Sequence, residues 1–145
     1  MDHIVKMFFV AAMMSAVMAF SAFAAPNAEE NEIIRLTNEY RQANGLNALA
    51  VDDRMEEAAT TRALEASILW SHTRPNGTQW YTANEALLYG ENLASYYTKP
   101  ENVVNAWINS DAHRENLLKD FDTICVKKVV VNGVSYYAQE FGYFD

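Results

Sequence analysis

The sequence predicts an α+β domain in which helices cover an antiparallel sheet. Three observations lead to this class. Apolar residues recur at helical spacing in the first half of the chain. Two β-rich runs, Ile124 to Val131 and Val134 to Phe141, end the chain and are joined by Asn132-Gly133, a strong hairpin signal. About 120 residues follow the N-terminal leader, which is enough for one domain with a core and too short for two.

The first residues are typical of a secretory leader. Lys6 gives a basic start, Met7 to Phe20 is apolar almost throughout, and Ala22-Phe23-Ala24 fits the small-x-small pattern of a cleavage site. A retained anchor is the alternative, but a spanning helix needs about 20 apolar residues. We therefore expect a signal peptide over residues 1–24, a polar segment over 25–31 and one domain over 32–145, in a protein that is secreted or held in the cell envelope.

Two helices are expected in the first half of the domain. Apolar positions at helical spacing over residues 33–40 indicate the first helix, and Asn44-Gly45 is a usual way for a helix to end. The second helix begins at Asp52 or Asp53, since Asp53 and Glu56 have the spacing of a capping box. Its alanine-rich face predicts close packing against a sheet or another helix.

The middle of the chain alternates loops with short elements. Pro75-Asn76-Gly77 forms a turn, which places His72 on a loop after the second helix. Residues 82–88 could form a short helix, and Leu93 to Tyr97 is extended in character. Pro100-Glu101 opens a third helix, with proline in its first turn and an acid that the helix dipole favours.

Charge and cysteine usage exclude some function classes. The formal net charge is −8, so phosphate backbones repel the chain and we expect no nucleic-acid partner. Cys125 is the single cysteine and therefore cannot form an intramolecular disulfide. Because it lies in an apolar strand-like run, we expect a buried and inert thiol.

The candidate site consists of two histidines and a carboxylate. His72 and His113 are the two histidines beyond the leader, and Glu91 lies between them in the sequence. If the fold brings the three together, they could form a divalent-metal site or an acid-base site. Ser110 would project to the same side as His113 if the third helix continues through Asp111.

Each of these residues also has an ordinary structural interpretation, and the residues alone do not decide between the two. The alternatives are a helix-terminal cation for His113, an exposed hydroxyl for Ser110, backbone hydrogen bonds for Glu91, and packing on Trp70 or Trp80 for His72. Several aromatic residues could instead line a cleft suited to sugars or lipids, namely Trp70, Trp80, Tyr81, Tyr89, Tyr96 and Tyr97.

Four motifs occur in a distinctive order: Ser-His-Thr-Arg-Pro-Asn-Gly from Ser71, Gly-Glu-Asn-Leu-Ala from Gly90, Val-Val-Asn-Ala-Trp-Ile-Asn-Ser-x-x-His-Arg-x-Asn-Leu-Leu from Val103, and Gln-x-Phe-Gly from Gln139. This set resembles the CAP superfamily of cysteine-rich secretory proteins, antigen 5 and pathogenesis-related 1 proteins. The chain looks most like the bacterial secreted branch with SCP domains, and the likeness covers residues 33–142. Four ordered motifs are far more specific than any one of them.

The resemblance implies a three-layer α-β-α sandwich with a mainly antiparallel sheet and a cleft lined by a histidine and glutamate tetrad. Carried over by motif, the tetrad positions are His72, Glu91, Ser110 and His113. Ser110 is a departure, because animal and plant members usually have a carboxylate there. One ligand fewer weakens the expected metal site of His72 and His113, for which Glu91 is the candidate third ligand. We expect no required cofactor and at most weak binding of Zn²⁺ or another divalent cation.

Other motif residues are expected to support the fold around the cleft. Arg114 would orient a carboxylate or a backbone carbonyl, and Asn116 would cap a turn. Asn92 and Gln139 are assigned the same kind of supporting role. Two further departures from the family pattern are the absent disulfides and Tyr137, which stands where tryptophan is common.

Two functions remain open. The first is a monomeric binding module for a lipid, a sterol, a cell-envelope glycan or a host surface, which would meet a membrane only through an uncleaved leader. The second is a peptidase or esterase in which Ser110, His113 and Glu91 act as nucleophile, base and orienting acid, or in which a histidine-bound metal activates water. The sequence favours binding, because it holds no Gly-x-Ser-x-Gly or His-Glu-x-x-His motif. A purely structural envelope protein is a third possibility.

Overall fold

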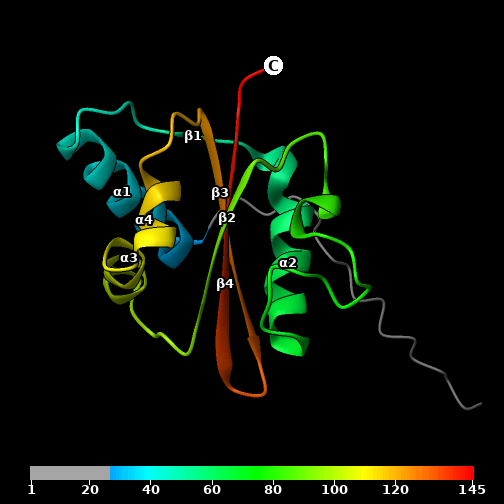
Figure 1. Cartoon of the computed structure of the whole chain (residues 1–145). Helices are drawn as coiled ribbons and strands as arrows, with labels where there is room; N and C mark the ends of the chain where they lie inside the picture. Colours follow the sequence, from blue (N-terminus) through cyan, green and yellow to red (C-terminus); the bar gives the residue numbers. More distant parts are fainter. Residues whose placement is uncertain (1–26) are drawn as a thin grey trace, which may run out of the picture.

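The computed structural model describes residues 27–145 as a four-stranded sheet between helices (Figure 1). The helices are α1 (Ala28–Ala43), α2 (Glu56–Ile68), α3 (Pro100–Ile108) and α4 (Asp111–Leu117), the strands are β1 (Ala50–Val51), β2 (Gly90–Ser95), β3 (Thr123–Val131) and β4 (Val134–Gly142), and the short 3₁₀ helices are η1 (Asp53–Met55) and η2 (Trp80–Ala83). The expected leader lies outside the described residues. Within residues 27–145, none of the helices has the length and apolar character needed to cross a bilayer.

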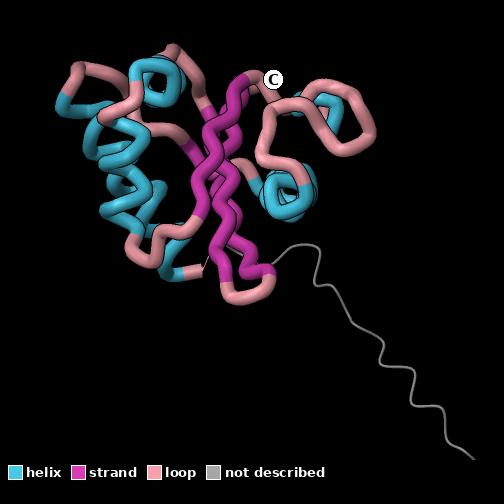
Figure 2. Tube along the Cα trace, turned by 60° about the horizontal axis from the view of Figure 1, so that its bottom comes forward, coloured by secondary structure: helices cyan, strands magenta, loops and turns pink. Residues whose placement is uncertain are grey.

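The elements form three layers, which confirms the predicted α+β class and sandwich. Helix α2 covers one face of the sheet, while α1, α3 and α4 lie together on the other (Figures 1 and 2). The strand order is β1-β3-β4-β2, and β1 alone is parallel to its neighbour β3. The sheet is therefore mainly antiparallel, as expected.

The predicted C-terminal hairpin is confirmed. Strands β3 and β4 pair antiparallel from Thr123 opposite Gly142 to Val131 opposite Val134. Asn132 and Gly133 both have positive φ, 51° and 77°, which the two-residue turn of a right-twisted hairpin requires. Strand β2 then pairs along the other edge of β4 and becomes an edge strand of the sheet.

Helix α1 begins earlier than expected, so the polar segment over residues 25–31 is partly wrong. The side chain of Asn27 caps the helix by accepting a hydrogen bond from Glu30 N, and the Glu30 carboxylate accepts one from Asn27 N, both at 2.9 Å. This capping box satisfies free N–H groups of the first turn, which allows a polar run to start a helix. The helix ends at Asn44 and Gly45 as predicted.

Two local expectations in the middle of the chain are corrected. Before α2, Asp52 rather than Asp53 is the cap, because its side chain accepts from Arg54 N and opens η1. Residues 82–88 do not form a helix of their own. The 3₁₀ helix η2 covers Trp80–Ala83 and turns follow it, because Asn84 has an extended backbone (φ −163°, ψ 91°) that ends η2.

The third helix does not continue through Asp111. Helix α3 ends at Ile108, Ser110 is extended with φ −109° and ψ 121°, and α4 starts at Asp111. Asn and Ser favour helix ends because their short polar side chains compete for backbone hydrogen bonds. Ser110 and His113 are therefore not on one continuous helix face.

Alternation along the strands divides the core into two. The larger cluster packs under α1, α3 and α4 and contains Ile33, Trp107, Leu117, Val126, Tyr137 and Phe141. Under α2, small residues such as Ala59, Ala63 and Ala138 allow the helix to approach the sheet closely. Successive residues of β2 consequently point into different layers, with Glu91 toward α2 and Asn92 toward the other helices.

Candidate functional site: a histidine cleft backed by a buried carboxylate

The site centres on a hydrogen bond between His72 and Glu91. His72 lies on the loop after α2, and Glu91 is the second residue of β2. The two meet at 2.8 Å between Nδ1 and Oε1, while the side chains are 50% and 1% exposed. The structure thus joins two tetrad positions that are 19 residues apart in the sequence.

Arg62 of α2 holds Glu91 from the opposite side. It donates from Nε to Oε2 at 2.8 Å and from Nη2 to Oε1 at 2.9 Å, and its side chain is fully buried. A second Nη2 hydrogen bond, to Ser71 O at 2.9 Å, fixes the backbone next to His72. Arg62 therefore positions both the carboxylate and the histidine loop.

These contacts keep Glu91 ionised. Burial by itself raises the pKa of Glu91, but hydrogen bonds with His72 and Arg62 and the charge of Arg62 outweigh it and lower the pKa to about 2. An ionised carboxylate only accepts hydrogen bonds, so the nitrogen of His72 that faces it carries the proton. The neutral His72 ring then has its lone pair on Nε2.

A second polar network lies on the other face of β2. Asn92 donates to Gln139 Oε1 at 3.0 Å and to the backbone oxygen of His113 at 3.2 Å. Asn116 donates to Asn92 Oδ1 at 3.1 Å, and Gln139 donates to Thr37 Oγ1 at 3.0 Å. The network ties α4 and α1 to the sheet through the motif residues that we expected to support the fold.

The outer edge of β2 is closed by side chains of α3 and α4. The other edge of β2 pairs with β4, so the backbone carbonyls on the outer edge need partners other than a neighbouring strand. Asn116 donates to Glu91 O at 3.0 Å, and the indole of Trp107 donates to Leu93 O at 2.9 Å. These bonds fix the strand that carries Glu91, which gives a physical role to the tryptophan and asparagine of the third motif.

His113 and Ser110 are placed differently from His72 and Glu91. Burial, followed by repulsion between the two rings in their protonated forms, lowers the pKa of His113, so its ring is neutral at pH 7. Ser110 is the N-cap residue of α4 without a side-chain capping bond. In the described part of the chain, no hydrogen bond links Glu91 or the Ser110 hydroxyl to the His113 ring.

Arg114 braces the break between α3 and α4. It donates to Ile108 O at 2.9 Å, a carbonyl at the end of α3, and to Asp111 Oδ1 at 2.7 Å in the first turn of α4. These are a backbone carbonyl and a carboxylate, the two kinds of partner that the sequence suggested for it. The brace sets the position of α4, and with it that of His113.

The cleft itself has a volume of about 270 Å³. Two tetrad positions, His72 and Glu91, line it together with Trp80, Tyr89, Gly90, Asn116 and Lys119. It therefore combines two aromatic rings with an imidazole, an amide and an ammonium group. Tyr89 is 54% exposed and packs edge-on against Tyr143 with ring centroids 5.1 Å apart.

The donor set does not fit a resident metal ion. Among the described residues, no three His, Cys, Asp or Glu side chains are grouped so that they could hold one. Glu91 accepts three hydrogen bonds from Arg62 and His72, so it orients His72 instead of serving as a free ligand. Two imidazoles, His72 and His113, are the remaining candidates for a weak cation site.

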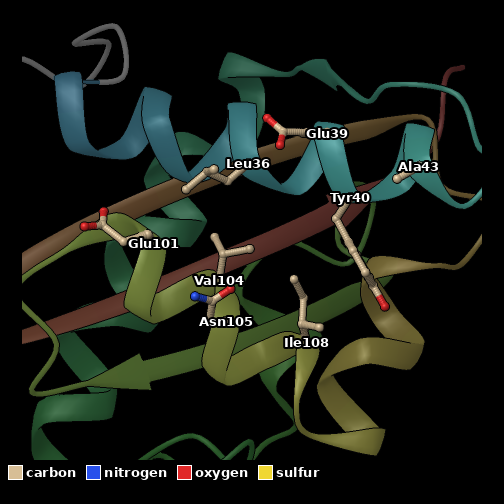
Figure 3. A pocket seen from close by; sticks show the side chains of 8 residues that line it. All are labelled: Leu36, Glu39, Tyr40, Ala43, Glu101, Val104, Asn105 and Ile108. Carbon is tan, nitrogen blue, oxygen red and sulfur yellow. The ribbon is translucent and has the colours of Figure 1, made fainter.

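A separate cavity of about 220 Å³ lies between α1 and α3 (Figure 3). Its side chains mix apolar groups from both helices with two carboxylates, and comprise Leu36, Glu39, Tyr40, Ala43, Glu101, Val104, Asn105 and Ile108. This cavity has none of the tetrad residues. Like the histidine cleft, it is smaller than the roughly 300–1,000 Å³ that drug-sized ligands occupy, so either could hold only a small group or part of a larger molecule.

Comparison with known proteins defines the class of protein to which this chain belongs. Residues 34–141 match the cysteine-rich secretory protein family, CAP, and the chain belongs to this family. Protein YkwD of Bacillus subtilis is 32% identical over 111 residues, which cover 68% of this chain and 41% of that protein. The chain thus matches about two fifths of the length of this relative.

Solved structures agree with the family and the fold. An outer surface protein from Borrelia burgdorferi has a TM-score of 0.71 and 25% identity, with 84% of this chain and 97% of that chain covered. An extracellular protein with an SCP domain from Bacillus anthracis has a TM-score of 0.70 and 25% identity, with 82% and 41% covered. The predicted resemblance is confirmed.

Sequence reasoning missed the cleft residue Lys119 and two buried charged residues of the site, Arg62 and Glu140. Arg62 stands among alanines at positions where a helix faces its core, and a charge there signals a buried partner. Glu140 is the variable residue of the Gln-x-Phe-Gly motif, within a strand that is otherwise suited to burial. Charged residues at core-facing positions were the signal that could have identified both.

Proposed function

We propose that this protein is a secreted binding module whose histidine cleft takes a saccharide unit of a cell-envelope glycan. The observation that carries the proposal is a half-exposed His72, fixed by a buried Glu91, in a cleft that also presents Trp80, Tyr89 and Asn116. Aromatic faces beside fixed hydrogen-bonding groups match the apolar faces and hydroxyl groups of a sugar ring.

The charges in the cleft favour a polar ligand over an apolar one. Lys119 supplies an ammonium donor on a protein of net charge −8, and the Nε2 lone pair of a neutral His72 can accept a hydroxyl proton. The extracellular and outer-surface neighbours support export, as does the leader-like N-terminus. A lipid or sterol, if bound, would instead suit the more apolar cavity between α1 and α3.

A hydrolase remains the second candidate because of one observation. The Glu91–His72 pair has the arrangement of a carboxylate that orients a general base, at 2.8 Å. The triad of Ser110, His113 and Glu91 has less support, since Glu91 bonds to His72 and not to His113. Loss of peptidase or esterase activity in His72→Gln, with activity retained in Ser110→Ala, would identify the base and exclude the serine.

Binding is tested by following backbone amide NMR signals of the purified exported protein while a soluble peptidoglycan fragment is added. We expect shifts to concentrate around His72, Tyr89 and Asn116. Trp80→Ala should weaken binding roughly fivefold, because a stacked aromatic ring contributes on the order of 1 kcal/mol. Glu39→Gln, at the rim of the other cavity, is the matched control and should bind normally.

The same titration with a fatty acid separates the two ligand classes. Shifts confined to residues between α1 and α3, with no response of the histidine cleft to the glycan fragment, would contradict the proposal and favour an apolar ligand. Equal glycan binding by wild type and Trp80→Ala would show that the cleft is not the binding site.

A further inference from the structure

Glu140 is a fully buried carboxyl group behind the site. It lies on β4 directly opposite Glu91 of β2 and opposite Cys125 of β3, and its side chain shares their face of the sheet. Among the described residues, none donates a hydrogen bond to either carboxyl oxygen of Glu140. A buried carboxylate without a donor is costly, which directs attention to its protonation state.

The hydrogen bonds of Glu91 leave room for one more donor. A carboxylate offers about four acceptor positions, two on each oxygen. Oε1 of Glu91 accepts from His72 and from Arg62, whereas Oε2 accepts once, from Arg62. One position on Oε2 is therefore open, on a residue that faces Glu140 across the β2–β4 pair.

We propose that Glu140 is kept as a neutral carboxylic acid whose O–H donates to Oε2 of Glu91, which makes Glu140 a positioning residue for His72. The inference rests on the proposed function for its consequence in ligand binding. With all four acceptor positions filled, Glu91 cannot rotate away from His72. The imidazole then stays in the tautomer that carries its proton on Nδ1 and keeps the Nε2 lone pair for the cleft.

The surroundings of Glu140 support the neutral form. Burial first, then the negative charge of Glu91, raise the pKa of Glu140 well above its ordinary value, and the charge of Arg62 opposes this less strongly. Cys125, the remaining titratable neighbour, stays neutral because burial raises the pKa of its thiol to about 12. Arg62 also pairs with Glu65 at 3.2 Å, so two carboxylates already share this guanidinium and a third negative charge on Glu140 would lack a cation of its own.

The proton is tested directly by infrared difference spectroscopy of the purified protein at pH 7. Wild type should show the carbonyl band of a buried protonated carboxyl group, and Glu140→Gln should lack it. Absence of the band in wild type, or its persistence in Glu140→Gln, would overturn the proposal. This readout does not depend on any ligand.

The positioning role is tested by ¹⁵N NMR of the imidazole rings in two variants. Glu140→Gln retains an N–H donor of similar shape and should preserve the His72 tautomer and the glycan affinity. Glu140→Leu removes the donor, so we expect a mixed tautomer population, a changed His72 titration and roughly tenfold weaker binding, the lower end of the loss seen when an orienting partner is removed. Tyr136→Leu, on the same face of β4, is the control and should leave His72 unchanged.

The outcomes separate this inference from the proposed function. If Glu140→Leu does not fold, the infrared band and the Glu140→Gln variant still decide the matter. A Glu140→Gln variant with a disturbed His72 tautomer would show that a negative charge is needed, and would overturn the proposal. If wild type has the band and the Nδ1–H tautomer but binds no glycan, the proposed function fails while the role of Glu140 stands.

Discussion

Replacement of Arg62 by methionine should destabilise the domain strongly. The change removes the hydrogen bonds at 2.8 and 2.9 Å to Glu91 and the one to Ser71 O, and leaves a carboxylate that is 1% exposed without its cation. Removal of one partner from a buried ion pair costs about 3–5 kcal/mol. For a domain of this size, the melting temperature should fall by roughly 10 °C or more.

Urea unfolding of wild type and Arg62→Met measures this loss of unfolding free energy. Arg35→Met is the matched control, since Arg35 pairs with Glu32 and Glu39 on the surface and should contribute less than about 1 kcal/mol. Adding Glu91→Gln to Arg62→Met should restore part of the stability, because no buried charge is then unpaired. A loss below about 1 kcal/mol in Arg62→Met would refute the argument that this pair anchors the site.

Three further outcomes can be measured. The pKa of Glu91 is lowered to about 2, so the ionised group stabilises the fold fully above its unfolded pKa near 4.5, and this stabilisation is lost as the pH falls toward 2. The free energy of unfolding measured in urea should therefore fall by about 3 kcal/mol across this range, and an unchanged value would contradict the prediction. Gly90→Ala places a Cβ 2.7 Å from Phe121 Cζ, so the ring must move. We expect about 1–3 kcal/mol of destabilisation and altered NMR signals around the cleft, whereas wild-type stability of the variant would contradict this prediction. His72→Ala with His113→Ala should abolish any weak zinc binding detected by calorimetry, and equal uptake would exclude these imidazoles as ligands.

Local signals predicted the elements that depend on neighbouring residues. The turn at Asn132-Gly133 specifies the hairpin because both residues tolerate positive φ, and the ordered motifs identified the family. Capping was less predictable, since an equally good cap residue follows the observed one: Asp52 and Asp53 differ only in which backbone N–H they reach. The helix break before Asp111 combines the local preference of Asn109 and Ser110 for helix ends with the hydrogen bond from Arg114 to Ile108 O.

By itself, the sequence determined the fold class, the hairpin, the family and the positions of the motif residues along the chain. Tertiary structure alone decided which of them touch: Glu91 pairs with His72 and Arg62, while His113 contributes its backbone oxygen to Asn92. The reason is that chain-local preferences act through backbone dihedrals and spacing, whereas the partner of a buried charge depends on which elements pack across the sheet. Strand register, which places Glu140 opposite Glu91, is a property of the assembled sheet.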